Sequence, residues 1–344
     1  MTDKITEYLK NYDGEPKVIM EVCGTHTASI SENGIPSMLS DKIKLVSGPG
    51  CPVCVTVSAY IDKLVELALT RNVCVVTFGD LMRVRGSERS LSDAAADGAN
   101  VEMVYSPFDI FALAEKSPDT LFVFAAVGFE TTTPIYALML ERITNEGIDN
   151  IKFLTALKTM PEAIRTVARE NSAITGFLAP GHVSVITGSD LFSELAKELG
   201  IPFAVAGFTG GELLAAIYAL TKLNGGKSVN MYTSVVTAEG NTAARECVKK
   251  YFTTSPAAWR GFGIIENSGL ILRGEFARYD AGSAELTYDK SDDSGCRCGA
   301  VTAGRLSPAE CPLFSKVCTP SAPRGACMVS TEGSCFHYYM NNRK

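Results

Sequence analysis

The sequence predicts an α/β fold with two lobes, each a parallel sheet flanked by helices, followed by a cysteine-rich domain at the C-terminus. Short apolar runs alternate with amphipathic segments from Lys17 to about Phe208, and nearly every run ends in glycine, proline or polar residues. Six of the eleven cysteines lie between Cys296 and Cys335. This alternation is typical of βαβ units, in which helices cover both faces of a parallel sheet.

The apolar runs are the candidate strands because they are short and rich in apolar or β-branched residues. They span residues 18–22, 43–46, 73–78, 101–105, 121–127, 153–157, 176–179 and 203–206. Helices are expected between them. Residues 58–69 place their apolar side chains on one face, Pro161 suits the first turn of a second helix, and Ser189 or Asp190 can cap a third that ends at Gly200.

We expect lobes at residues 1–120 and 121–255, divided near residues 117–120, and a third domain at residues 256–344. A short β-rich passage and a polar linker at residues 289–294 precede the cysteine-dense tail. In open α/β sheets, ligands bind outside the carboxyl ends of strands. The loops after the candidate strands are therefore expected to converge on one cleft or on two facing clefts.

The composition is that of an ordinary globular protein, with 46% hydrophobic and 20% charged residues among 344. The net charge of −6 argues against nucleic acid or an anionic membrane as a partner. The longest uncharged stretch, residues 171–189, contains Pro180, Gly181 and His182 and is too polar to span a membrane. The first residues lack the apolar core of a signal peptide, so a cytoplasmic location is expected.

The cysteine-dense tail predicts a metal centre, because cysteines in a reducing compartment more often bind metals or react than form structural disulfides. Four of its thiols follow the spacing Cys296-x14-Cys311-x6-Cys318-x16-Cys335, with Cys298 and Cys327 as additional thiols. Four thiolates suit zinc or an iron-sulfur cluster. The cluster is favoured because it can exchange electrons with a neighbouring dithiol, whereas zinc leaves the additional thiols without a role.

Two loops near the N-terminus carry a second group of reactive residues. Cys23 and His26 follow the first candidate strand, and Cys51 and Cys54 form a CxxC pair after the second. Cys23 and His26 could bind one late transition metal or form a nucleophilic pair, and His26 could also be an ordinary turn histidine. The CxxC pair could act as nucleophile, redox dithiol or metal ligand, or be inert.

Two further loop residues are candidates for the same cleft. Glu130 ends the strongly apolar run that begins at Leu121, and His182 follows the candidate strand at residues 176–179. Glu130 could act as an acid, a base or an anchor, or could simply place a negative charge at a helix N-terminus. His182 has the same two interpretations.

These motifs resemble those of the HypD family of hydrogenase maturation proteins over almost the whole chain. The shared motifs are MEVCGTHT (20–27), GPGCPVC (48–54), GFETT (128–132), APGHVS (179–184), WRGFG (259–263), SGL (268–270) and, in the tail, CRCG, CPLFSKVCTP, GACMVS and EGSC. The chain departs from the family pattern at Ala28, where many members have histidine, at Arg85, where proline is common, and at residues 209–212, which replace an acidic segment.

The resemblance implies a scaffold that assembles the Fe(CN)2CO unit of nickel-iron hydrogenases in a stable complex with the small protein HypC. A second protein, HypE, would supply cyanide as a thiocyanate, and the hydrogenase large subunit would be an indirect partner. By motif, Cys23 would hold the iron at the HypC interface with His26 beside it. Cys51 and Cys54 would be cleft thiols, and the cleft would also be lined by Glu130 and His182.

For the tail, the resemblance implies a [4Fe-4S] cluster and a neighbouring redox pair, similar to ferredoxin:thioredoxin reductase. The cluster ligands would be Cys296, Cys311, Cys318 and Cys335, and the redox pair would be Cys298 and Cys327. Two other functions remain open. A freestanding thiol-disulfide oxidoreductase would turn over without HypC, and a zinc-stabilised binding scaffold would be colourless.

Overall fold

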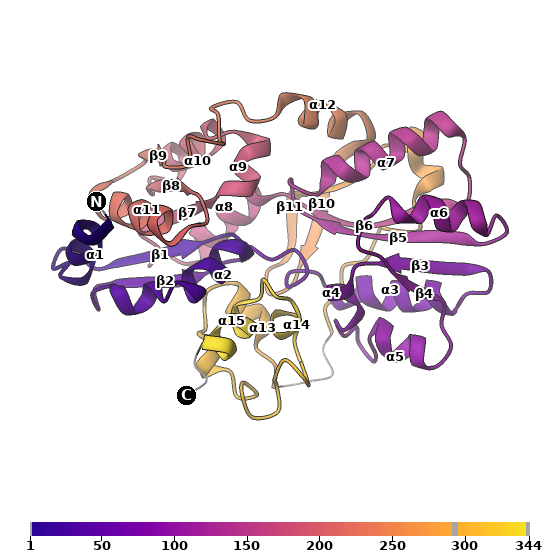
Figure 1. The fold of residues 1–344 in the computed structure, drawn as a ribbon, viewed down its shortest axis with the longest axis horizontal. Coiled ribbons are helices and arrows are strands. Elements are labelled where there is room, and N and C mark those ends of the chain that lie inside the picture. Colours follow the sequence, from indigo (N-terminus) through magenta and orange to yellow (C-terminus); the bar gives the residue numbers. More distant parts are fainter. Residues whose placement is uncertain (1, 291–294, 342–344) are drawn as a thin grey trace.

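The computed structural model describes residues 2–290 and 295–341, and it has the predicted α/β architecture. Two sheets flanked by helices form two lobes, and the cysteine-rich tail lies between them (Figure 1). The predicted linker at residues 289–294 is described only as far as Lys290, and residues 291–294 lie outside the described residues.

The first lobe is built on a five-stranded sheet in which all neighbouring strands are parallel, in the order β2-β1-β7-β8-β9. Its strands are β1 (Lys17–Glu21), β2 (Ile43–Ser47), β7 (Gly176–Pro180), β8 (Phe203–Ala206) and β9 (Ser228–Asn230). β7 and β8 are buried along their whole length, as expected for a sheet covered on both faces.

The second lobe is built on a six-stranded mixed sheet in the order β10-β11-β6-β5-β3-β4. Its strands are β3 (Val73–Thr77), β4 (Val101–Met103), β5 (Leu121–Gly128), β6 (Ile151–Lys158), β10 (Phe252–Trp259) and β11 (Gly263–Leu272). β3 to β6 are parallel, and the β10–β11 hairpin adds antiparallel to β6. This hairpin contains the β-rich passage expected after residue 255.

Helices connect the strands and cover the sheets. They are α1 (Thr2–Lys10), α2 (Gly24–Glu32), α3 (Ser58–Leu69), α4 (Gly79–Met82), α5 (Leu91–Ala96), α6 (Asp109–Lys116), α7 (Thr133–Glu146), α8 (Met160–Glu170), α9 (Gly181–Thr187), α10 (Asp190–Leu199), α11 (Gly210–Lys222), α12 (Thr242–Tyr251), α13 (Cys298–Thr302), α14 (Ala326–Val329) and α15 (Ser334–Asn341). Short 3-10 helices are η1 (Ile35–Met38), η2 (Gly274–Tyr279) and η3 (Pro308–Glu310). The expected α3 and the glycine end of α10 are both present, since Gly200 adopts φ 68°.

The chain passes between the two sheets more than once. It leaves the first sheet after β2, builds β3 to β6 in the second, and returns to the first for β7 to β9 before the hairpin. The boundary expected near residues 117–120 therefore falls between α6 and β5, inside the run that builds the six-stranded sheet. Both sheets are made of similar βα units, and a sequence pattern does not reveal which sheet a unit joins.

One apolar core joins the two lobes. It contains Val22 from the end of β1, Phe177 from β7, Phe129 from the end of β5 and the fully buried Trp259 of β10. The rings of Phe129 and Trp259 stack with centroids 5.8 Å apart. This shared core fixes the carboxyl end of β5 relative to the first sheet.

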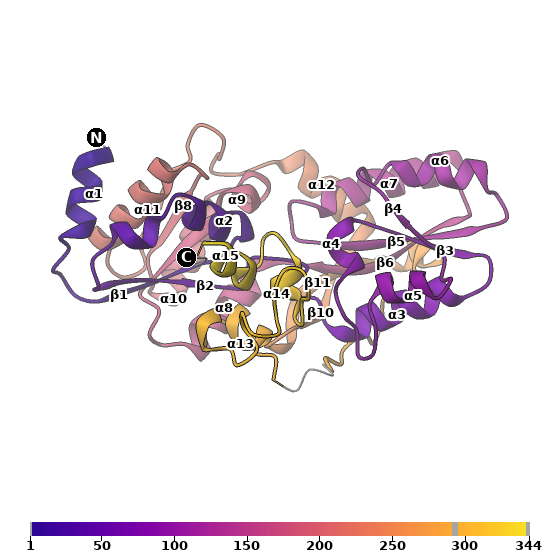
Figure 2. The same ribbon diagram turned by 60° about the horizontal axis from the view of Figure 1, so that its bottom comes forward.

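The tail packs between the lobes and contacts loops of both, as Figure 2 shows. Glu332 accepts a hydrogen bond from Thr25 at the start of α2, and Ser330 donates to Asp80 of α4. Across the described ranges, no helix combines the length and the apolar character that a membrane crossing requires.

Candidate functional site

The loops after β1 and β2 meet backbone to backbone at Cys23 and Gly50. Cys23 ends the extended segment before α2, and the N–H of Gly24 donates to the carbonyl of Gly50 at 2.9 Å. A Cβ on Gly50 would lie 2.2 Å from the Cys23 backbone nitrogen and 2.5 Å from its Cα. Only glycine fits here, and this contact brings the loop of Cys51 against Cys23.

Replacing Gly50 by alanine is expected to destabilise the protein by about 3 kcal/mol or more, at the upper end of the range for overpacking, because the clash is with backbone atoms that cannot rotate away. Chemical denaturation measures this change. The matched control is Gly211→Ala in α11, where the described residues leave the added Cβ free of contacts within 4 Å. A Gly50→Ala protein as stable as the Gly211→Ala control would contradict this close approach.

A buried carboxyl group holds Cys23 in place. Glu21 accepts hydrogen bonds from the backbone N–H of Cys23 at 2.9 Å and from the hydroxyl of Thr27. Burial raises the pKa of Glu21 to about 7 and that of the Cys23 thiol to about 12. The free thiol is therefore protonated at neutral pH, and a bound cation would be needed to hold it as thiolate.

His26 and His182 both contact the ring of Phe208. The ring of Phe208, which follows β8, is 5.0 Å from that of His26 and 3.9 Å from that of His182. His26 Nε2 lies 3.2 Å from the carbonyl of Ala206 and 3.1 Å from that of Gly207, so it carries the proton. The carboxyl ends of β1, β7 and β8 thus place both imidazoles in one cluster.

The free nitrogen of His26 is its Nδ1 atom. It is buried and has no hydrogen-bond partner among the described residues. Burial lowers the pKa of His26 to about 4, so the ring is neutral and Nδ1 keeps its lone pair. Because Nε2 donates to carbonyl groups, only Nδ1 could bind a metal or accept a hydrogen bond from a thiol.

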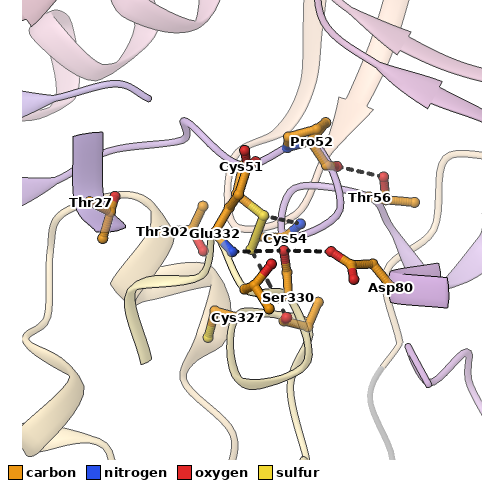
Figure 3. The surroundings of a disulfide bond; sticks show 12 residues. Thr27, Cys51, Pro52, Cys54, Thr56, Asp80, Thr302, Cys327, Ser330 and Glu332 are labelled. Carbon is orange, nitrogen blue, oxygen red and sulfur yellow. Dashed lines mark hydrogen bonds between the residues drawn. A yellow bond between two sulfur atoms is a disulfide. The ribbon is translucent and has the colours of Figure 1, made fainter. Parts of the chain in front are cut away.

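The CxxC pair forms a disulfide between Cys51 and Cys54, in a turn that precedes α3 (Figure 3). Cys54 Sγ lies 4.0 Å from the carbonyl oxygen of Ala326, next to Cys327 of the tail. Cys51, Cys54, Cys298 and Cys327 belong to one buried cluster. The structure therefore brings the N-terminal thiol pair and the tail thiols together.

Cys298 and Cys327 are neighbours inside the tail. The N–H of Cys327 donates to Cys298 Sγ at 3.4 Å, and Cys327 Sγ also lies 3.1 Å from Cys335 Sγ. A hydrogen bond with Cys327, and then burial, raise the pKa of Cys298 well above its usual range. The two thiols expected to form a redox pair are free and adjacent.

The four thiols expected to bind a cluster also gather. Burial raises the pKa of the Cys296 thiol to about 12. Negative charge on Cys311 or Cys318 contributes to raising the pKa of both Cys296 and Cys335, as expected for thiols that lie near one another. Within residues 2–290 and 295–341, no group of three or more His, Cys, Asp or Glu side chains is arranged to hold a single metal ion. Cysteine thiolates are the donors that zinc sites and iron-sulfur clusters use, so the chemistry of these four residues fits such a group.

Glu130 binds the first residue of α8. Its Oε1 accepts from the backbone N–H of Met160 at 2.8 Å, at the first residue of that helix, while Oε2 is buried without a partner in the described parts of the chain. Burial raises the pKa of Glu130 to about 7. Glu130 is thus a helix N-terminal carboxyl that also carries an unsatisfied oxygen.

Replacing Glu130 by glutamine should remove a pH dependence of stability. A carboxyl group with a raised pKa in the folded state stabilises the protein at low pH and loses that contribution as the pH rises. The window runs from 4.5 to about 7, and the free energy of unfolding falls by about 1.4 kcal/mol per pH unit within it. Denaturation of wild type, Glu130→Gln and the exposed control Glu194→Gln across this range checks the difference; parallel curves for wild type and Glu130→Gln would contradict it.

Sequence reasoning missed three residues of this region. Glu21 binds Cys23, Phe208 contacts both imidazoles, and Glu332 approaches the start of α2. Glu21 could have been found, because an acidic residue within a buried apolar run is unusual. The other two are placed by tertiary packing between segments far apart in the sequence.

Comparison with known proteins identifies the family of this chain. The sequence profile described as "HypD: Hydrogenase formation hypA family" matches residues 1–342. The hydrogenase maturation factor HypD of Rhodobacter capsulatus is 39% identical over 336 residues, covering 94% of this chain and 89% of the relative. That of Escherichia coli K12 is 38% identical over 331 residues, with the same coverage. The chain therefore belongs to the HypD family of hydrogenase maturation factors.

Proposed function

We propose that this protein is a cytoplasmic scaffold on which the Fe(CN)2CO unit of nickel-iron hydrogenases is assembled, in a stable complex with HypC and a transient complex with HypE. The observation that carries the proposal is the convergence of three groups of residues: Cys23 with its buried carboxyl, the Cys51–Cys54 disulfide, and the tail thiols. In this proposal, these groups would supply an anchor for iron and a source of electrons in one region.

Cys23 is the residue proposed to hold the iron of the substrate unit. A thiolate suits a low-valent iron that carries carbonyl and cyanide ligands. Glu21 accepts a hydrogen bond from the backbone N–H of Cys23, and this contact does not involve the thiol group that would bind the iron. His26 can contribute only Nδ1, since Nε2 is bound by carbonyls.

Release of cyanide from a thiocyanate breaks a sulfur–carbon bond, consumes two electrons and one proton, and leaves a thiol and cyanide. A dithiol can supply both electrons by forming a disulfide, and releases two protons. The pair Cys51 and Cys54 is present in its oxidised form. It would be re-reduced by Cys298 and Cys327, which lie in the same buried cluster.

The tail would complete this route with a [4Fe-4S] cluster on Cys296, Cys311, Cys318 and Cys335. When bound, the cluster would supply single electrons to the neighbouring thiols. The chain's own contribution is to gather the thiols and to exclude water from them, since five of the six tail cysteines are buried and Cys296 is partly buried.

Complementation tests the proposal. Expression in a strain that lacks its own HypD, but retains HypC, HypE and a nickel-iron hydrogenase, is expected to restore hydrogenase activity. A freestanding oxidoreductase would instead reduce a protein disulfide such as that of insulin without HypC. Turnover of insulin combined with no restoration of hydrogenase activity would replace our proposal by that function.

A further inference from the structure

A cavity of about 430 Å³ lies behind the CxxC loop, away from the cysteines. It is bounded by the end of β6, the β10–β11 hairpin and the segment after η2, and its lining includes Thr56 and Val57, which follow Cys54. Its size falls in the range of about 300–1,000 Å³ typical of small-molecule sites. None of the proposed iron or cluster ligands lines it.

A row of three residues crosses the sheet at this cavity. Gly269 of β11 pairs with Ser255 of β10 on one side and with Lys158 of β6 on the other. Residues directly opposite each other share one face of a sheet. Gly269 has no side chain, so the row has a notch at its centre, and the Cβ of Ala257 and Oγ of Ser255 reach into it; all three residues of the row line the cavity.

Lys158 is a buried cation without a counterion. Its side chain is only 3% exposed, and within the described residues it makes no hydrogen bond or ion pair. Its ammonium lies 5.8 Å from the centre of the Trp259 ring. Burial, together with the positive charge of Arg260, lowers the pKa of Lys158 to about 7. An unpaired buried ammonium is costly unless a ligand supplies the missing negative charge.

Two hydroxyl groups of the cavity lining are also unpaired. Ser255 Oγ and Thr155 Oγ1 are both buried and have no hydrogen-bond partner in the described parts of the chain. Ser255 Oγ faces the notch, since a Cβ on Gly269 would lie 3.0 Å from it. Buried polar groups are normally satisfied, so a cation and hydroxyls without partners around one cavity point to a missing acceptor.

We propose that this cavity binds a small organic monoanion, a carboxylate with an apolar body, whose carboxylate meets Lys158 and the Ser255 hydroxyl. The lining contains one unpaired cation, whereas Asp280 and Glu285 place acids around the same cavity and disfavour a dianion such as a phosphate ester. Val57, Ala257 and Leu286 are apolar residues that line the same cavity and can contact the body of the ligand.

Calorimetric titration of the full-length protein with hexanoate, hexanol and inorganic phosphate tests the proposal. Hexanoate is expected to bind at one site per chain. Hexanol, which has the same body without the charge, is expected to bind roughly tenfold more weakly or worse, because a hydrogen bond to a charged group is lost. Inorganic phosphate is expected not to compete.

Variants separate this site from adventitious binding. Lys158→Met keeps the side-chain length without the charge and should weaken hexanoate binding roughly tenfold or more. Lys152→Met, on the same strand but outside the cavity lining, should bind like wild type, and Ser255→Ala should bind more weakly. If Lys158→Met did not fold, the affinities of hexanoate and hexanol for wild type and for Ser255→Ala would show whether the carboxylate group of the ligand is recognised.

Three results would overturn the proposal. They are equal affinity for hexanoate and hexanol, hexanoate affinity unchanged in a folded Lys158→Met protein, and the absence of hexanoate binding at millimolar concentration. Tighter binding of phosphate than of hexanoate would likewise refute the assigned ligand class.

Discussion

Replacing Cys23 by alanine is expected to remove the iron unit that carries carbonyl and cyanide from the purified protein, while tail-bound iron remains, and to reduce hydrogenase maturation below detection. The physical reason is that Cys23 supplies the thiol where Gly50 of the β2 loop packs against the end of β1, beside the Glu21 carboxyl group that accepts its backbone N–H. Carbonyl and cyanide infrared bands of the anaerobically purified complex with HypC, together with hydrogenase activity in the complemented strain, measure both effects.

The matched control for this experiment is Cys74→Ala. Cys74 is also buried, but it lies within β3 in the core of the second lobe, and burial raises its pKa to about 11. Its removal should cost some stability and leave the carbonyl and cyanide bands intact. A Cys23→Ala protein whose complex with HypC still showed the carbonyl and cyanide bands at the wild-type level would refute the anchoring role.

Replacing Cys318 by alanine is the second change with a large expected effect. It removes one of the four thiols proposed to hold the cluster, and we expect the broad visible absorption and the tail-bound iron to be lost. The tail should also become less stable, because metal binding contributes directly to the folding of small metal domains. Visible spectra and iron analysis of the anaerobic protein check this prediction.

Cys247→Ala is the control for that variant, since Cys247 is a partly exposed cysteine on α12, outside the tail. It should retain colour and iron. If Cys318→Ala kept the absorption of the wild-type protein, the assignment of the four ligands would be wrong.

The sequence predicted the elements well because their signals are local. The strand at residues 203–206 was predicted with its observed bounds, and so was the helix Ser58–Leu69, since apolar runs and one-faced helices follow from nearest neighbours. The convergence of loops at strand ends followed from the general rule for parallel sheets. The same rule indicates that Cys23, Cys51 and His182, which follow candidate strands, are candidate site residues.

The arrangement of the lobes could not be predicted in the same way. β7 pairs with β1, although Gly176 follows its partner Ile19 by 157 residues in the sequence, and this pairing depends on which sheet offers a free edge. The use of His26 Nε2 by two carbonyls and the unpaired state of Lys158 also depend on segments distant in sequence. Composition and spacing identify such residues, while packing decides which of their atoms remain available.

Infrared and visible spectra of the anaerobically purified complex with HypC test the central claim most directly. Our account predicts carbonyl and cyanide stretching bands from the iron unit held at Cys23, together with the broad visible absorption of an iron-sulfur cluster in the tail. A colourless complex that contains zinc as its metal and shows no carbonyl or cyanide bands would contradict it.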